Sequence, residues 1–431
     1  MPGRRAFLGA VAGTLAAASS HRVSGQARAR RLLLRSSWQT VNIGDVAHTP
    51  GVLRLLEQHL PDVDVTLWAS PLNEAVRGLL RTRFPRVRVI EQAERPDLSG
   101  TEVEAAMRDT DLVMHGSGPS IVSPSSLRLA RALGKPYGIY GVTLDTLDAS
   151  MQEVVAGAAF AFTRETASLE YLTSLALRVP AQAFAPDGTF ALDIRDDATA
   201  DAYCRAHGLE TGRFLCVVPR LRYTPYPWIT EGAARGEAEP IRRLKVNEEF
   251  TARDHAKLRD VIVAWVRGRH GKVLACPEMT YQVPLLRPLL FDGLPDDVKP
   301  AVVVRDRYWR TDEAASTYAR ASLVVSCEMH SPIIALANGT PAIHVRQPTD
   351  TRKGQMWRDV GLSEWLFEID DTPGTAIAAR AVLIAADPAA ARVAVARAMG
   401  VARERQRETM RVVATTLGAR FVEAERPTPK A

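Results

Sequence analysis

The stretch that best indicates the fold reads Val324-Val325-Ser326-Cys327-Glu328-Met329-His330-Ser331-Pro332-Ile333-Ile334-Ala335-Leu336-Ala337-Asn338-Gly339-Thr340-Pro341. Its apolar start is typical of a strand, and the apolar run after Pro332 is typical of a helix that Asn338-Gly339 ends. Because Ser331 suits the N-cap and Pro332 the first helical position, we expect His330 to lie beside a helix N-terminus. In open α/β sheets, ligands bind at the carboxyl ends of strands, where a helix N-terminus also attracts phosphate. The stretch therefore predicts a binding site around His330.

The alternation of strand-like and helix-like segments continues in both directions from this stretch. A helix is expected over residues 50–60, and helices are expected again over residues 375–417. Strands are expected at residues 32–34, 63–68, 87–90, 111–114, 137–140, 158–162, 214–218, 273–275, 301–304, 323–325 and 342–345. Strands that alternate with helices predict parallel, doubly wound sheets and an α/β fold class.

The length of the chain predicts two domains. Its 431 residues exceed the ~250–300 residues at which a single core usually stops growing. A turn-rich segment between residues 187 and 211 interrupts the apolar pattern. We therefore expect an N-terminal Rossmann-like domain at residues 30–195, a C-terminal Rossmann-like domain with terminal helices at residues 196–425, and a cleft between them.

The first 29 residues are typical of an export signal. Arg4-Arg5-Ala6-Phe7-Leu8 is followed by a Gly/Ala-rich apolar run that ends near Ala18. A twin arginine before a short apolar run and small residues predicts twin-arginine export and cleavage. Because of this signal, the mature protein is predicted to lie outside the cytoplasm, in the periplasm or outside the cell. No other segment is expected to span a membrane. The alternative is a cytoplasmic protein with a disordered basic start.

Composition and charge exclude several classes of function. The formal net charge of +6 favours anionic ligands, but the arginines are scattered and form no stripe with aromatic residues, so no nucleic-acid partner is expected. The four cysteines show no CxxC spacing, so no metal site and no cofactor are predicted. The sequence leaves the oligomeric state open.

Several motifs together resemble one known family. Residues 326–343 give a strand, a histidine, an apolar helix and a Gly-x-Pro strand. Further matches are Asn42-Ile43-Gly44-Asp45, His115-Gly116-Ser117-Gly118, Arg164-Glu165-x-x-Ser168 and Ala185-Pro186-Asp187. In order and spacing these residues, from about residue 31 to 366, resemble the polysaccharide pyruvyl transferases. The resemblance implies a GT-B-like architecture and a transferase that moves a carboxyvinyl unit from phosphoenolpyruvate to a sugar of a surface polysaccharide.

The resemblance also suggests residues that handle the donor. His330 would be the general acid, with Glu328 influencing its tautomer and pKa, and Arg164 would bind a donor anion. Many family members carry arginine where this chain has Glu328, so the missing positive charge would have to come from elsewhere. The candidates are Arg220, Arg346 and Lys353, and Ser331 completes the expected donor site.

A second group of residues is expected on the acceptor side. By resemblance, Asn42 and Asp45 would face the acceptor sugar from the N-terminal domain. Gly116 and Gly118 permit a close approach of the backbone, which either ligand binding or helix packing requires. Glu278 ends a strand of the second domain and is a further carboxylate candidate at the cleft. The simpler interpretations are a turn at Asn42 to Gly44, a helix cap for Asp45 and a structural cap for Glu278. For Arg164 of the donor site, the simpler interpretation is a surface ion pair.

Two other functions fit the same sequence. One is a GT-B-type glycosyltransferase that uses a nucleotide sugar, because the architecture does not decide the chemistry. The other is an exported, non-catalytic protein that binds carbohydrate. Export conflicts with the use of phosphoenolpyruvate or a nucleotide sugar, since both donors are cytoplasmic metabolites. We rank pyruvyl transfer first because the histidine and its cationic surroundings are present.

Overall fold

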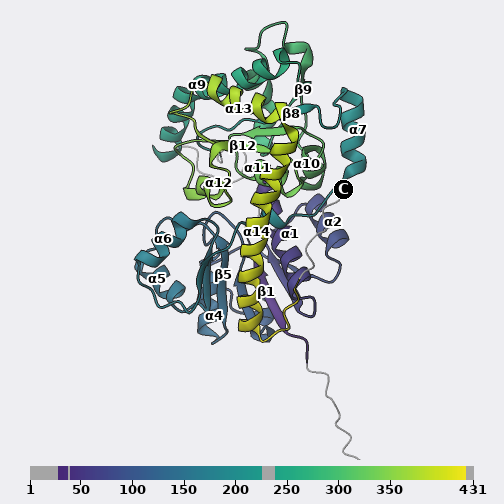
Figure 1. The fold of residues 1–431 in the computed structure, drawn as a ribbon. Coiled ribbons are helices and arrows are strands. Elements are labelled where there is room, and N and C mark those ends of the chain that lie inside the picture. Colours follow the sequence, from purple (N-terminus) through teal and green to yellow (C-terminus); the bar gives the residue numbers. More distant parts are fainter. Residues whose placement is uncertain (1–27, 37–38, 226–237, 424–431) are drawn as a thin grey trace, which may run out of the picture.

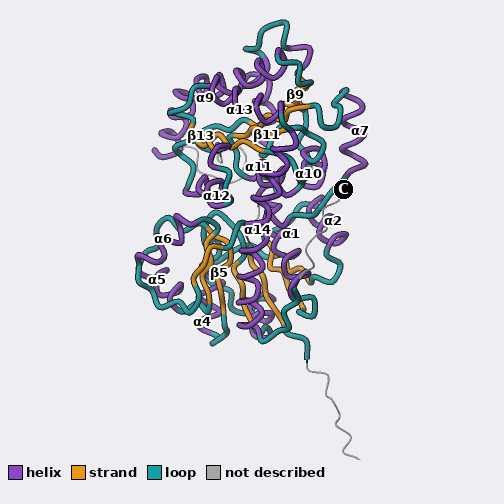
Figure 2. The backbone as a smooth tube through the Cα atoms, viewed as in Figure 1, coloured by secondary structure: helices purple, strands orange, loops and turns teal. Residues whose placement is uncertain are grey.

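The computed structural model describes residues 28–36, 39–225 and 238–423. These residues form two lobes, each built around a parallel sheet with helices on both faces (Figures 1 and 2). The predicted export signal lies in residues 1–29, of which 1–27 are outside the described residues. No helix of the described part of the chain is both long and apolar enough to cross a membrane.

The first sheet has the strand order β3-β2-β1-β4-β5-β6-β7. Its strands are β1 (Arg31–Arg35), β2 (Asp64–Ala69), β3 (Arg88–Glu91), β4 (Leu112–His115), β5 (Tyr137–Val142), β6 (Phe160–Thr163) and β7 (Gln182–Phe184). Its helices are α1 (Ile43–His59), α2 (Glu74–Arg83), α3 (Glu102–Asp109), α4 (Pro124–Ala132), α5 (Ala149–Ala156) and α6 (Thr166–Ser174), followed by the turn η1 (Gly188–Ala191). The order reverses between β1 and β4, as in doubly wound folds, so the carboxyl ends of these strands open a crevice for a site.

The second sheet has the strand order β10-β9-β8-β11-β12-β13. Its strands are β8 (Phe214–Val218), β9 (Lys272–Ala275), β10 (Val302–Val304), β11 (Leu323–Ser326), β12 (Ala342–Arg346) and β13 (Leu366–Glu368). Its helices are α7 (Asp197–His207), α9 (Ala238–Arg267), α10 (Thr311–Tyr318), α11 (His330–Ala337), α12 (Gln355–Asp359), α13 (Gly374–Ala386) and α14 (Pro388–Leu417), with a short helical turn η2 (Thr280–Leu285). Every strand that the sequence predicts is present, and the edge strands β7 and β13 were not predicted.

Helix α14 connects the two lobes. Its first half contributes Ala391, Val395 and Met399 to the core of the second sheet. Its last turns contribute Met410 and Leu417 to the core of the first sheet, along which the helix runs in Figure 1. The core of the first lobe is therefore completed by residues that the sequence-based division assigns to the C-terminal domain.

The lobes also contact each other through the start of α1. The backbone N–H of Ile43 donates to the carbonyl of Glu278 at 3.1 Å, and that of Thr280 donates to the carbonyl of Val41 at 3.0 Å. Ile43 itself is buried in the core of the second sheet. The amino end of α1 is thus held by residues that follow β9, and both sheets direct strand ends toward this contact.

Two local predictions were wrong. Helix α1 begins at Ile43 rather than near Pro50, because Asn42 caps it with its side chain. Helix α11 begins at His330 after Met329, so Ser331 is not its N-cap. The backbone N–H and the hydroxyl of Ser331 both donate to Glu278 instead, at 2.6 and 2.7 Å. A carboxylate from the loop after β9 replaces the local cap, which the sequence of the helix alone does not reveal.

Candidate functional site

His330 lies where the two lobes meet. It is the first residue of α11, and its side chain is only 8% exposed. Its Nδ1 lies 3.4 Å from Oε1 of Glu278, and its Nε2 lies 3.9 Å from Oδ2 of Asp187, which follows β7 of the first sheet. The imidazole therefore stands between a carboxylate of each lobe.

Gly44 makes room for this imidazole. A Cβ atom added to Gly44 would lie 2.3 Å from the Cβ of His330 and 2.4 Å from its Nδ1. Such distances are far below van der Waals contact, so only glycine allows the backbone of α1 to pack on the ring. The glycine of the Asn42-Ile43-Gly44-Asp45 motif thus positions a residue of the other lobe.

Glu278 holds the start of α11 as well as His330. Its Oε2 accepts the two hydrogen bonds from Ser331, so its negative charge lies at the amino end of the helix. Burial raises the pKa of Glu278, while the hydrogen bonds from Ser331 lower it. The predicted carboxylate at the end of β9 is therefore a positioning group for the histidine helix.

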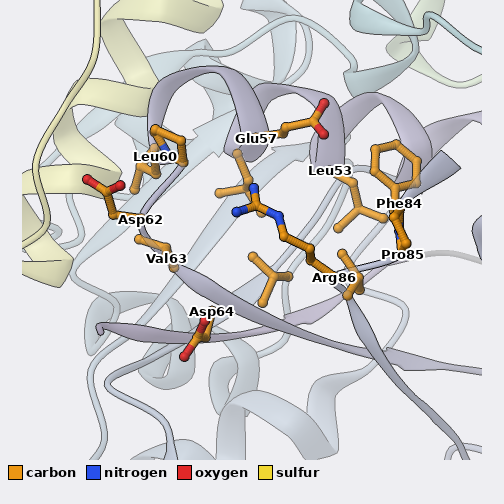
Figure 3. Close-up of a pocket in the computed structure, with 13 residues that line it drawn as sticks. Leu53, Glu57, Leu60, Asp62, Val63, Asp64, Phe84, Pro85 and Arg86 are labelled. Carbon is orange, nitrogen blue, oxygen red and sulfur yellow. The ribbon is translucent and has the colours of Figure 1, made fainter. Parts of the chain in front are cut away.

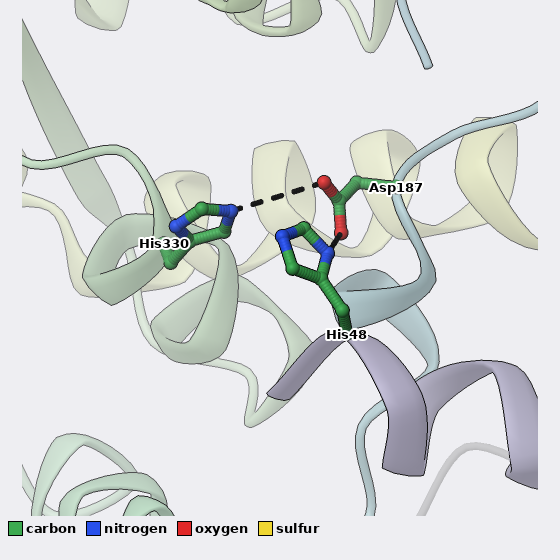
Figure 4. A group of neighbouring side chains, drawn as sticks. All are labelled: His48, Asp187 and His330. Atoms are coloured by element: carbon green, nitrogen blue, oxygen red, sulfur yellow. Dashed lines mark hydrogen bonds and ion pairs between the residues drawn. The ribbon is translucent and has the colours of Figure 1, made fainter. Parts of the chain in front are cut away.

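Asp187 is the centre of the contacts on the first lobe (Figure 4). Its Oδ1 lies 2.9 Å from Nδ1 of His48, and its Oδ2 accepts a hydrogen bond from Nη1 of Arg164 at 2.9 Å. The hydroxyl of Ser117 lies 3.0 Å from the same ring nitrogen of His48. Burial opposes the charge of Asp187, but His48 and Arg164 outweigh burial and hold its pKa well below the usual value. Asp187 is thus an anion at neutral pH that orients both a cation and an imidazole.

The two histidines present unpaired nitrogens to the same region. The rings of His48 and His330 meet edge to face with centroids 4.6 Å apart. Burial lowers the pKa of His330 to about 3 and also lowers that of His48, so both rings are neutral near pH 7. The Nε2 atoms of both rings and Nη2 of Arg164 are buried without a hydrogen-bond partner among the described residues. Buried polar atoms of this kind are satisfied when a ligand binds.

A second charged group lies beside them in the C-terminal lobe. Glu328 accepts a hydrogen bond from the side-chain amide of Gln282 at 2.8 Å, and its Oε2 lies 3.3 Å from Nε of Arg220. Arg220 also pairs with Asp350, whose carboxylate lies 3.3 Å from Nζ of Lys353. Burial raises the pKa of Glu328 to about 7 although Arg220 opposes this shift. Near neutral pH Glu328 can therefore gain or lose a proton.

These groups form one electrostatic unit, because each influences the ionisation of its neighbours. We call it the interdomain cluster, and its members are Asp45, His48, Arg164, Asp187, Arg220, Glu278, Glu328, His330, Asp350 and Lys353. The sequence predicted seven of these members, all but His48, Asp187 and Asp350, as site residues. Ser331 and Asn42 border the cluster.

The predicted acceptor residues at the start of α1 have clear local roles. The side-chain oxygen of Asn42 accepts hydrogen bonds from the backbone N–H groups of Gly44 and Asp45 at 2.7 and 3.3 Å, so Asn42 is the helix cap. Burial raises the pKa of Asp45 to about 6, with Glu278 adding to the rise and His48 opposing it. Asp45 therefore belongs to the charged interior, whereas Asn42 shapes the chain beside it.

Three predicted site residues contact strands and loops around the site. Arg346 pairs with Glu368 of β13 at 3.3 Å. Gly116 packs on β1, where an added Cβ would lie 2.7 Å from the hydroxyl of Ser36. Gly118 exchanges backbone hydrogen bonds with the end of β5 at 3.3 Å. The contribution of these three residues is to the packing of strands and loops around the site.

Sequence reasoning assigned no role to His48, Ser117 and Asp187. Ser117 lies in the motif His115-Gly116-Ser117-Gly118, of which only the glycines were predicted as site residues, and Asp187 ends the motif Ala185-Pro186-Asp187. His48 follows Asp45 by three residues, which places both on one face of a helix. The predicted helix began at Pro50 and therefore did not include Asp45 and His48, whereas α1 begins at Ile43 and includes both.

Three of these side chains could hold a metal ion. The ligand atoms of His48, Asp187 and His330 lie within 4.8 Å of one another. The sequence predicted no metal site. The guanidinium of Arg164 already donates to Asp187, and a fixed positive charge there disfavours a divalent cation. The arrangement fits acid–base chemistry better than metal binding.

Two cavities that described residues line lie outside the cluster. A cavity of about 460 Å³ lies at the carboxyl end of α1, between Leu53, Leu60, Val63, Phe84 and the side chain of Arg86 (Figure 3). Helix α1 is about 25 Å long, so this cavity is remote from its amino end. A smaller cavity of about 160 Å³ lies between α1, α2 and the segment before α10, and includes Ile43. It borders the lobe interface, but not the histidines.

Solved structures share this architecture. The chain resembles S. aureus MnaA in complex with UDP at 10% identity and a TM-score of 0.57, over 93% of this chain and 99% of that one. It resembles the UDP-GlcNAc 2-epimerase of Neisseria meningitidis bound to UDP-GlcNAc at 8% identity and a TM-score of 0.55, over 90% of this chain and 100% of that one. HepE of Anabaena in complex with UDP matches at 11% identity and a TM-score of 0.53, over 90% of this chain and 99% of that one. At such identities the likeness shows the fold alone, and it confirms the predicted GT-B-like pair of Rossmann-like domains.

Sequence comparison shows the family. No curated protein matches the chain in sequence. The model of the polysaccharide pyruvyl transferase family, however, matches residues 42–347, which include the start of α1, the Asp187 loop and the histidine helix α11. Since this match covers most of the chain, the protein belongs to the polysaccharide pyruvyl transferase family.

Proposed function

We propose that the protein transfers the carboxyvinyl group of phosphoenolpyruvate to a sugar of a surface polysaccharide and leaves a pyruvate ketal there. In this reaction the methylene carbon of the donor gains a proton. Two hydroxyl groups of the sugar then form C–O bonds to the central carbon, and the C–O bond to phosphate breaks. The two sugar hydroxyls release two protons: one replaces the proton that the methylene carbon gained, and the other ends on the departing phosphate.

The observation that carries the proposal is the place of His330 at the lobe interface. Its Nε2 and Nη2 of Arg164 are buried without partners among the described residues, and both groups lie beside Oδ2 of Asp187. The imidazole is neutral in the free protein because burial lowers its pKa to about 3. A donor that carries a phosphate and a carboxylate would raise this pKa by its negative charge. We therefore assign His330 the role of proton donor only when the donor is bound.

Three cations are available to the donor. Arg164 is completely buried, while the side chains of Arg220 and Lys353 are 12% and 13% exposed. The last two lie at the edge of the cluster that solvent reaches, and each can contribute hydrogen bonds to phosphate or carboxylate oxygens. On the other side of His330, Asp45 and His48 are the polar groups of the first lobe that an acceptor hydroxyl would meet.

Calorimetric titration with phosphoenolpyruvate tests the proposal. We expect saturable binding by the full chain and loss of binding in His330→Ala and Arg164→Ala. His207→Ala is the matched control, because among the described residues the ring of His207 contacts only its own helix, through the carbonyl and the ring of Tyr203. UDP is the comparison ligand. Binding of UDP without any binding of phosphoenolpyruvate, or unchanged binding by His330→Ala, would contradict the proposal.

We also propose that the twin-arginine segment exports the protein. The proposal rests on Arg4-Arg5 and the apolar run after them. Fractionation of cells that express the chain, with Arg4→Lys and Arg5→Lys together as the comparison, measures it. Recovery of the wild-type chain in the cytoplasmic fraction alone would favour the alternative location, where phosphoenolpyruvate is available.

A further inference from the structure

The interdomain cluster contains more acids than cations. The acids are Asp45, Asp187, Glu278, Glu328 and Asp350, and the cations are Arg164, Arg220 and Lys353. Both histidines are neutral, so they do not offset the difference. A donor with a phosphate and a carboxylate would add further negative charge to this buried region. Loss of negative charge from this region would therefore favour binding of an anion.

The cations that solvent reaches are already paired. Arg220 contacts Asp350 through Nη1 and Glu328 through Nε, and Lys353 contacts Asp350. Asp350 is fixed as an anion, because Arg220 and Lys353 outweigh its burial and keep its pKa below the usual value. Glu328 is held less firmly, since the only cation within ion-pair distance among the described residues is Arg220, at 3.3 Å. Of the two carboxylates on Arg220, Glu328 is thus the one that can give up its charge.

We propose that Glu328 sets the charge of the ligand that this site accepts: an anionic donor binds together with one proton, which Glu328 takes up, and Arg220 then turns its charge toward the donor. The proposal rests on the proposed function and deepens it. The proton comes from solvent and forms an O–H bond on the Glu328 carboxylate; no bond of the protein breaks. The amide of Gln282, which donates to Oε1, leaves Oε2 as the oxygen that accepts the proton.

The surroundings of Glu328 agree with this assignment. Groups from four neighbouring segments act on its ionisation: Arg220 after β8, Glu278 after β9, Tyr281 of η2, and Asp350 with Lys353 after β12. Its own strand end adds a hydrogen bond between its backbone N–H and Ser326. The side chain is 5% exposed, so its charged form is poorly hydrated. Burial raises the pKa of Glu328 to about 7, so the proton is available without a large change of pH.

The experiment is calorimetric titration of the full chain with phosphoenolpyruvate between pH 7.5 and 9. In this range the phosphate of the donor, whose second pKa is about 6, stays a dianion. Relative to Glu328→Gln, we expect the dissociation constant of the wild type to rise by about tenfold per pH unit, because one more proton is linked to binding. The same titration in two buffers of different ionisation enthalpy should show that the wild type takes up close to one proton more than Glu328→Gln does, a difference that cancels any proton that His330 gains with the donor.

Glu328→Gln keeps the shape and the hydrogen bond but removes the charge. We expect its dissociation constant to rise with pH less steeply than that of the wild type, by about tenfold per pH unit. Its affinity should exceed that of the wild type about tenfold at pH 8 and about a hundredfold at pH 9. Glu364→Gln is the matched control, since the side chain of Glu364 is 77% exposed and its one ion pair within the described part of the chain is with Arg380. It should keep the affinity and the pH dependence of the wild type.

The results distinguish this inference from the proposed function. Binding without proton uptake, or an unchanged pH slope in Glu328→Gln, would overturn the inference and leave the function intact. Absence of phosphoenolpyruvate binding in both the wild type and Glu328→Gln would overturn both. Binding that Glu328→Gln strengthens, but that His330→Ala leaves unaltered, would support the inference and contradict the assigned role of His330.

Discussion

Replacement of Gly44 by alanine is the sharpest test of the interface. The added methyl carbon would lie 2.3 Å from the Cβ of His330 and 2.4 Å from its Nδ1, where ordinary contacts are 3.4 Å or longer. At least 1 Å of overlap must therefore be relieved, either by α1 or by α11. Both helices are buried at this point, and overpacking of a tight site costs about 1–3 kcal/mol. We expect Gly44→Ala to lower the free energy of unfolding by this amount and to weaken phosphoenolpyruvate binding.

Urea unfolding measures this loss, and the chain offers a control of opposite sign. Gly78 lies inside α2 and has no atom within 4 Å of the position of an added Cβ. Gly78→Ala should therefore stabilise the protein by about 0.5–1 kcal/mol, as alanine does within helices. Equal stability of Gly44→Ala and the wild type, with donor binding intact, would refute the argument that Gly44 positions His330.

Three further predictions concern the charged interior. Asp187→Asn leaves the buried guanidinium of Arg164 without its carboxylate and should lower the free energy of unfolding in urea by about 3 kcal/mol. Asp193→Asn, in a partly exposed ion pair, should lower it by under about 1 kcal/mol, and similar losses in the two variants would contradict this reasoning. The pKa of His330 is lowered to about 3 in the folded protein and is near 6.5 in the unfolded chain, so its contribution to stability is present above pH 6.5 and is lost as pH falls. The urea midpoint should therefore drop between pH 7 and 4, and it should drop less steeply in His330→Asn. Because Arg164 donates a hydrogen bond to the carboxylate of Asp187, dialysis against EDTA should not change donor binding. Loss of binding that added zinc restores would refute the acid–base interpretation.

Much of the fold could be predicted because it rests on local pattern. Each interior strand is a short apolar run, and the runs at β8 and β11 are fully buried, so hydrophobicity alone identifies them. The edge strands β7 and β13 have only three residues each and are half-buried, so they lack this signal. Helix α14 was predicted, but its packing on both lobes depends on tertiary contacts that no local pattern encodes.

The site could be predicted only in part, for a different physical reason. His330 was found because a strand end followed by a helix places it at the edge of a parallel sheet. The pairing of Asp187 with His48 joins residues that are 139 positions apart, and the sequence around either one does not name its partner. Arg346 ends β12 as the pattern suggests, yet its guanidinium reaches Glu368 on the neighbouring strand. Strand ends can be predicted from sequence, whereas side-chain partners depend on packing.

Helix α14 has a mechanical consequence for the whole molecule. Its 30 residues form a rod of about 45 Å, anchored near Val395 in one core and near Val413 in the other. The lobes are not joined by a flexible linker alone, because this helix packs in both cores. If the lobes move apart, the helix must bend or leave one of the two cores. Gly400 lies between the two anchors and is exposed. No atom lies within 4 Å of the position of an added Cβ there, and glycine gives the helix backbone more conformational freedom at this point. An opening of the lobes that keeps both anchors must therefore bend the last helix.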